Sequence, residues 1–183
     1  MKKIIALLLT GILALALFAC GGDTPDKPTE SNNTNPTQAS SGTPGDIIEE
    51  IYFESAGVRI EVGVLPEPIL EALGEPEKTF ESKSCALNAK DINYKYNGFV
   101  LTVTYPEKGD NYIAVIKLPD DACKIPGGIT IGSTFEDVTA AYGMDYKEST
   151  GFFTYSQGLD SLEFSIEDGK VNQIKYVYDF INA

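Results

Sequence analysis

Histidine is absent from all 183 residues of the chain, and tryptophan is absent too. Without histidine the chain lacks the usual general base, the imidazole metal ligand and every Ser-His-Asp or Cys-His arrangement. Paired carboxylates remain available for glycosidic chemistry. Capping and solvation, however, account for the acidic residues that stand singly at predicted turns and helix starts: Glu67, Glu136, Asp137, Glu167 and Asp168. We therefore expect no enzyme, with a carboxylate-dependent enzyme as an alternative.

Positive charge is scarce. The chain has 14 Lys and Arg against 27 Asp and Glu, and its formal net charge is −13. Nucleic acids and anionic lipids are bound mainly by Lys and Arg that neutralise phosphate, so we expect no nucleic-acid partner. Simple solubility explains the acidity. No glycine-rich phosphate loop precedes a predicted helix, since the glycines at 127–128 open a predicted strand, and we expect no cofactor.

The first 20 residues read as an export signal. Lys2 and Lys3 precede an apolar run from Ile4 to Phe18, and a small residue stands at the cleavage site before Cys20. The ending LFAC resembles the lipobox of bacterial lipoproteins, which implies that Cys20 receives a diacylglyceryl group and becomes the first residue of the mature protein. Two acyl chains anchor a protein stably in a bilayer. A retained transmembrane helix is the alternative.

Residues 21–45 consist almost entirely of Gly, Pro, Ser, Thr, Asn, Asp and Gln. Such a segment buries too little apolar surface to offset its ordering entropy, so it predicts a disordered tether. Position 22 is Gly, and the lipoprotein pattern therefore offers no Asp there as an inner-membrane retention signal. We expect a lipid anchor at the extracellular face of the cell membrane, in a Gram-positive cell, with residues 46–183 as a single domain.

Two stretches of this domain are nearly the same. VGVLPEPILEALG at 62–74 and IGSTFEDVTAAYG at 131–143 align without a gap and share two glycines, a glutamate and an alanine. Each predicts a strand end, a turn and a helix that ends at Gly74 or Gly143. Ser133 stands three residues before Glu136, which is the spacing of a capping box.

The hydrophobic period changes to two after each helix, which predicts antiparallel strands. These strands are 92–96, 99–105 and 112–118 after the first helix, and 152–155, 161–166 and 173–178 after the second. A further hairpin, 51–55 to 58–62, precedes the first helix, and its second strand corresponds to 128–131. The predicted fold class is α+β: two tandem helix-plus-antiparallel-hairpin repeats, about 58–118 and 128–178, share one antiparallel sheet with both helices on one face.

The order of helix, glycine turn and meander, stated twice, resembles the β-lactamase-inhibitor-protein fold, and more loosely the small outer-membrane-assembly lipoproteins that carry half of it. The stretches 80–106 and 128–143 also resemble anchored lipoproteins of Gram-positive anaerobes. This resemblance implies the fold and leaves the activity open. One function that it suggests is inhibition of an extracellular hydrolase.

Cys85 and Cys123 form an even pair in an exported protein. Either they form a disulfide, which would stabilise the fold by about 3–4 kcal/mol, or they are two buried thiols. Two cysteines without histidine fall short of a zinc set, and we expect no metal site. The pair Asp120 and Asp121 matches no regular calcium loop, and calcium binding there stays an alternative.

Alternation along the strands predicts which sheet face stays open. With Leu101, Val103, Leu162, Phe164, Ile166, Ile174 and Tyr176 facing inward, the outward set is Thr102, Thr104, Glu163, Ser165, Gln173, Lys175 and Val177. This mixed polar face is the predicted binding face. Together these features predict a non-catalytic binding or interaction module for a protein or a cell-envelope component, with a carboxylate-dependent envelope enzyme as the second alternative.

Overall fold

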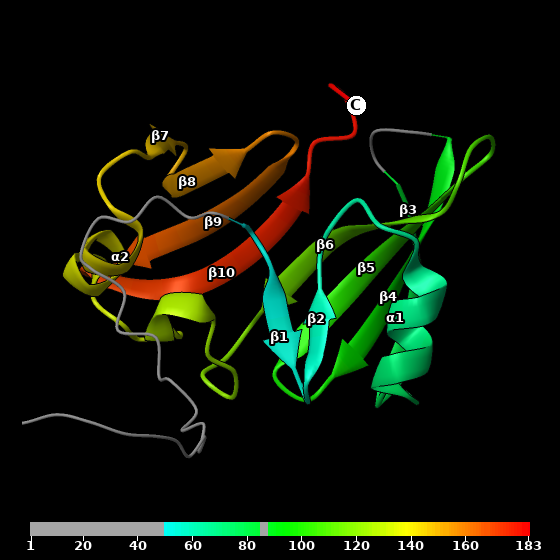
Figure 1. Cartoon of the computed structure of the whole chain (residues 1–183), viewed down its shortest axis with the longest axis horizontal. Coiled ribbons are helices and arrows are strands. Elements are labelled where there is room, and N and C mark those ends of the chain that lie inside the picture. Colours follow the sequence, from blue (N-terminus) through cyan, green and yellow to red (C-terminus); the bar gives the residue numbers. More distant parts are fainter. Residues whose placement is uncertain (1–49, 85–87) are drawn as a thin grey trace, which may run out of the picture. The chain divides into compact units, whose positions relative to one another are not determined.

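The computed structural model describes residues 50–84 and 88–183 (Figure 1). The predicted signal peptide, Cys20, the predicted tether and Cys85 lie outside the described residues. Within the described range, no helix has the length and apolar character needed to cross a membrane.

An eight-stranded sheet dominates the structure, and every neighbouring pair of its strands is antiparallel. In order across the sheet the strands are β3 (Lys78–Lys83), β4 (Ala89–Tyr96), β5 (Phe99–Pro106), β6 (Tyr112–Leu118), β10 (Lys170–Tyr178), β9 (Asp160–Glu167), β8 (Phe152–Gln157) and β7 (Lys147–Ser149). The first four strands and the last four each form a meander. The two meanders meet where β6 pairs with β10.

Two short helices precede the two meanders. Helix α1 (Pro66–Leu73) has proline in its first turn, where a missing N–H costs little, and α2 (Phe135–Tyr142) carries a capping box. Both helices end at a glycine of positive φ, Gly74 at 73° and Gly143 at 82°. A 3₁₀ turn, η1 (Pro126–Gly128), lies between β6 and α2.

A separate two-stranded sheet forms from β1 (Phe53–Ser55) and β2 (Val58–Ile60). Its turn residues, Ala56 and Gly57, have φ values of 51° and 78°, the mirror-image conformation that suits a tight hairpin. Phe53 is fully buried, and its ring centroid lies 5.1 Å from that of Phe99. The hairpin therefore covers part of the large sheet, as Figure 1 also indicates.

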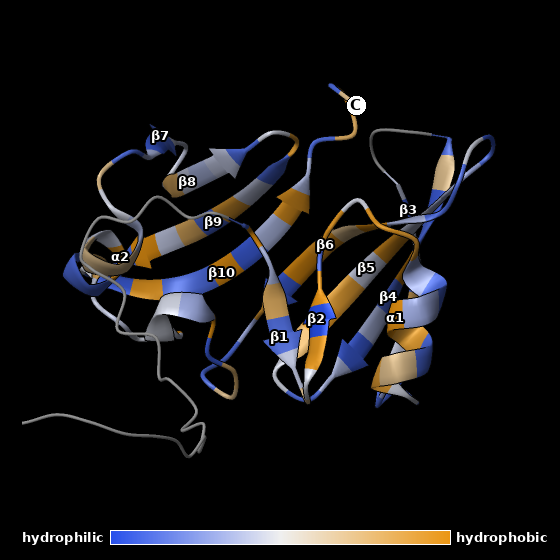
Figure 2. Ribbon diagram, in the orientation of Figure 1, coloured by the Kyte–Doolittle hydropathy of each residue, from blue (hydrophilic) through white to orange (hydrophobic). Residues whose placement is uncertain are grey.

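The core lies on one face of the large sheet, called the inner face here. On this face one cross-strand row, Leu101, Ile116, Tyr176 and Leu162, is 0–2% exposed. Tyr142 of α2 packs on Phe164 at a centroid distance of 5.6 Å, and Tyr96 of β4 reaches the end of α1. Both helices and the hairpin therefore contact the same face. The alternation is visible as bands along β5, β9 and β10 in Figure 2.

Each meander has four strands, where the sequence predicted three. The missed strands are β3 and β7. All residues of both are exposed, so neither has the apolar alternation that marks a half-buried strand. Both are edge strands, for which charged residues are typical.

Three further details differ from the sequence-based expectation. The hairpin β1–β2 forms its own sheet instead of extending the large one, and 128–131 forms no strand. The capping box of α2 uses Thr134 and Asp137, one residue beyond the predicted Ser133 and Glu136. The Ser133 hydroxyl accepts instead from the Thr130 amide at 3.1 Å, which fixes the loop before the helix.

Candidate binding surface

The outer face of the large sheet is the side opposite the core. Among residues 50–84 and 88–183, both helices and the β1–β2 hairpin contact the inner face, as their ring contacts and hydrogen bonds place them. The outer face thus carries the side chains that alternate with the buried ones along each strand. Neither helix nor the β1–β2 hairpin packs against it in the described part of the chain.

The strand register brings most of the predicted binding-face residues together. Thr102 and Val177 both lie opposite Val115, Lys175 lies opposite Glu163, and Gln173 lies opposite Ser165. These residues are half-buried, as side chains of a flat sheet surface are.

Thr104 lies on the same face but is only 4% exposed. Its hydroxyl donates to a carboxylate oxygen of Asp91 on the neighbouring strand at 2.8 Å. Thr104 thus has the predicted outward direction but is buried, because alternation gives the face of a residue and not what its neighbours cover. Thr104 therefore contributes to this face by holding the Asp91 side chain in place.

Cross-strand hydrogen bonds order the polar side chains of this face. The Thr102 hydroxyl donates to the Asn93 side-chain oxygen at 2.8 Å, and the Asn93 amide group donates to the Ser82 hydroxyl at 3.2 Å. The Lys175 ammonium lies 3.3 Å from the Glu163 carboxylate and 4.2 Å from the centroid of the Phe152 ring. The surface is preorganised across several strands.

Lysines form a line across this face that the sequence analysis missed. Following the register from one edge strand to the other gives a single row: Lys78, Lys95, Val100, Lys117, Lys175, Glu163, Thr154 and Lys147. Residues directly opposite each other share a face, so all eight side chains project outward. We call this set the lysine row.

The lysine row escaped the sequence analysis for two reasons. Lys78 and Lys147 lie on the two edge strands that alternation did not predict. Lys117 has the outward parity of its strand, but only the pairing of β6 with β10 shows that it stands opposite Lys175. That pairing joins residues about 60 positions apart in the chain, and short-range patterns carry no information on it.

Cys123 is a free thiol, and its sulfur donates to the Asn97 carbonyl oxygen at 3.7 Å. Burial raises the pKa of this thiol, with a smaller contribution from the charge of Asp120. Ser84, the last described residue before Cys85, donates its amide to the Ala89 carbonyl, at the other end of β4. The ends of β4 are roughly 25 Å apart at about 3.3 Å a residue, and a disulfide needs Cα atoms within about 7 Å. Cys85 itself lies outside the described residues, so the disulfide and the two free thiols both stay predictions.

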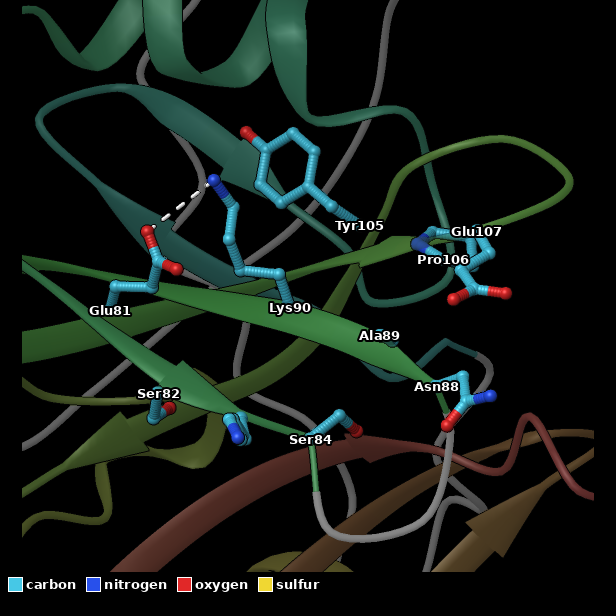
Figure 3. A pocket seen from close by; sticks show the side chains of 10 residues that line it. Glu81, Ser82, Ser84, Asn88, Ala89, Lys90, Tyr105, Pro106 and Glu107 are labelled. Atoms are coloured by element: carbon cyan, nitrogen blue, oxygen red, sulfur yellow. Dashed lines mark ion pairs between the residues drawn. The ribbon is translucent and has the colours of Figure 1, made fainter.

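A pocket of about 570 Å³ opens at the far end of β3, β4 and β5 (Figure 3). Glu81 and Glu107 are its acidic residues, and Tyr105 lines one wall. Glu81 forms an ion pair of 3.4 Å with Lys90, and both side chains are about half exposed or more. The pocket lining includes Ser84 and Asn88, and residues 85–87 between them are not described.

One of the two aspartates considered for calcium binding, Asp120, caps a turn. A carboxylate oxygen of Asp120 accepts from the Ala122 amide at 3.0 Å. Within residues 50–84 and 88–183, no group of three or more Cys, Asp or Glu side chains is arranged to hold a metal ion.

No known protein family, curated protein or solved structure matches this chain. The candidate surface therefore rests on its own geometry.

Proposed function

We propose that this protein is a membrane-anchored extracellular lipoprotein whose domain is a non-catalytic binding module, with the outer face of the large sheet as its binding surface. The partner is a protein or a component of the cell envelope. The observation that supports this most is a face of the eight-stranded sheet against which neither helix nor the hairpin of the described residues packs, and whose polar side chains are hydrogen-bonded across strands. A preordered surface loses little conformational entropy on binding.

The anchor belongs to the proposal through Cys20 and the sequence around it. A diacylglyceryl group there would hold the domain at the membrane by a tether of about 25 residues, 21–45. The composition of this segment, rich in Gly, Pro, Ser and Thr, is typical of a linker.

We also propose that the fold is an internal duplication. Matched backbone bonds support it: the Gly63 amide donates to the Ile113 carbonyl at 2.7 Å, and the Gly132 amide donates to the Val171 carbonyl at 2.7 Å. The return bonds, from Ile113 and Val171 to the residue after each glycine, measure 3.0 and 2.9 Å. Each meander also has its register shift at this place.

The two halves then meet about a local two-fold axis. The pairs Ile116–Tyr176 and Leu118–Ile174 flank the pair of Lys117 with Lys175 on the central strands. In the duplication, Lys117 corresponds to Lys175 and Lys78 corresponds to Lys147. This arrangement supports the resemblance to the β-lactamase-inhibitor-protein fold as a proposal for architecture, and fold alone carries no function.

The test uses the mature chain with Cys20→Ala, so that no lipid is attached, and measures its co-sedimentation with washed Gram-positive envelopes. Ser165→Trp and Gln173→Trp place bulk on the outer face and should abolish sedimentation. Glu71→Trp, on the exposed side of α1, is the matched control and should sediment like the parent. Equal sedimentation of all variants would exclude the outer face as the binding surface.

A further inference from the structure

We propose that the lysine row binds a linear polyol-phosphate polymer that lies across the strands of the outer face. This inference rests on the proposed function and names the class of envelope component. Five of the eleven Lys and Arg residues of the described range lie in this one row. In a domain so poor in cations, that concentration needs a reason.

The row contains two like-charge pairs. Lys78 lies directly opposite Lys95, and Lys117 lies directly opposite Lys175. Directly opposed side chains have Cβ atoms about 4.5–5.5 Å apart, and like charges in such pairs destabilise a sheet. An anion bound between two ammonium groups removes that repulsion.

Acidic neighbours neutralise only part of the row. Lys95 pairs with Glu77 and Lys175 pairs with Glu163, each at 3.3 Å. Lys78, Lys117 and Lys147 form no ion pair with any residue in 50–84 or 88–183. These three positive charges are available to a ligand.

Protection of the sheet edges explains the row only in part. Lysine on an edge strand discourages pairing with other chains, which suits Lys78 on β3 and Lys147 on β7. Lys117 and Lys175 lie on the two central strands, where both neighbours are already paired. The central pair therefore requires another explanation.

The charge forms a line and not a patch. One flanking row is uncharged and runs through Phe80, Asn93, Thr102, Val115, Val177, Ser161 and Ser156. On the other side, Gln173, Ser165, Phe152 and Ser149 are uncharged as well. An acidic globular protein would present its charge over an area, whereas a linear polymer presents it along one line. The row crosses all eight strands, which at about 4.8 Å a step spans roughly 34 Å.

The uncharged rows beside the lysine row favour a polymer that carries hydroxyl groups as well as negative charge. Hydroxyl and amide groups of Asn93, Thr102, Ser161, Gln173 and Ser165 border the ammonium groups. A polymer that alternates phosphates with hydroxyl-bearing units would engage both kinds of group. A polymer of carboxylates alone carries no hydroxyl group that could donate to the side-chain oxygens of these residues.

The negative charge of the whole domain does not prevent this binding. Fields between exposed charges decay over about 8 Å at physiological ionic strength. The electrostatic attraction of a ligand on the row therefore comes mainly from the lysines next to it, and distant acidic residues contribute little. The same screening makes the binding salt-dependent.

The experiment measures binding of synthetic poly(glycerol phosphate) to the mature chain with Cys20→Ala by isothermal titration calorimetry. The double variant Lys117→Gln/Lys175→Gln should lose at least tenfold in affinity. Lys108→Gln/Lys124→Gln removes two exposed lysines outside the row and should change affinity by less than twofold. The first variant relieves a like-charge pair but also removes the ion pair of Lys175 with Glu163, so a melting curve checks that it remains folded.

Two further ligands test whether the lysine row prefers a polymer to a monomer and phosphate to carboxylate. Monomeric glycerol phosphate should bind at least a hundredfold more weakly than the polymer, and polyglutamate at least tenfold more weakly. Equal affinity for polyglutamate, or no difference between the two double variants, would overturn the inference. If the polymer fails to bind while the tryptophan variants still abolish envelope sedimentation, the lysine-row ligand is wrong and the proposed binding face stands.

Discussion

The Tyr155 hydroxyl donates a hydrogen bond of 2.9 Å to the carbonyl oxygen of Gly143, the residue that ends α2. Tyr96 makes the same contact with Gly74 at the end of α1, at 3.2 Å. A sheet residue thus satisfies a backbone carbonyl left free at each helix end. The pair ties both helices to the inner face.

Removal of either hydroxyl should destabilise the domain by a similar amount. We expect Tyr96→Phe and Tyr155→Phe each to lower the free energy of unfolding by about 1 kcal/mol, the net value of one hydrogen bond. Equilibrium unfolding in urea measures this loss of free energy. Tyr146→Phe is the control, since the structure gives this hydroxyl no hydrogen-bond partner in residues 50–84 and 88–183. Unequal losses of stability in Tyr96→Phe and Tyr155→Phe would argue that the two hydroxyls do not have equivalent roles.

The helix ends were predictable and the tyrosine contacts were not. Gly74 and Gly143 followed from their position after a periodic run, which is a local signal. The partner tyrosines lie 22 and 12 residues from these glycines, and only the folded sheet brings them there. The same limit applied to the lysine row, whereas Thr102 and Lys175 were placed correctly on one face by alternation within single strands.

Tyr176 carries a buried hydroxyl without a hydrogen-bond partner in the described part of the chain. Burial raises its pKa well above the usual value, with smaller effects from Tyr142 and Tyr52. We expect Tyr176→Phe to keep the ring packing, including the contact with Phe53, and to raise the free energy of unfolding by about 1 kcal/mol. A loss of stability in chemical denaturation would mean that the hydroxyl has a partner.

Asp137 links the stability of α2 to pH. The backbone amide of Thr134 donates to its carboxylate at 2.9 Å, and this bond, followed by that of the Thr134 hydroxyl, lowers the pKa of Asp137. A lowered folded-state pKa contributes stability above the unfolded value of about 3.9, which is lost as the pH falls through the folded value.

The melting temperature of Asp137→Asn should therefore lie below that of the parent at pH 7, and the gap should narrow below about pH 4. Asp110→Asn, which removes an exposed carboxylate in the turn between β5 and β6, is the control, and its melting temperature at pH 7 should stay close to that of the parent. A gap for Asp137→Asn that stays constant down to pH 2 would contradict the linkage.

Cys123 should react slowly. Burial raises the pKa of its thiol, so at pH 7 the reactive thiolate is scarcer than in a free cysteine. We expect mass spectrometry of the unreduced mature chain with Cys20→Ala to find two free thiols, and Cys123 to be alkylated several-fold faster in urea than in buffer. A mass two units lower, with no labelling before reduction, would instead establish the disulfide with Cys85.

The central claim is that ligands meet the outer face of the large sheet. Its most direct test is the backbone amide spectrum of the ¹⁵N-labelled mature chain with Cys20→Ala, recorded during titration with poly(glycerol phosphate). The account predicts shifts concentrated at Thr102, Lys117, Gln173 and Lys175, with α1 and the β1–β2 hairpin unchanged. Shifts centred on α1 or that hairpin, with the lysine row unaffected, would contradict it.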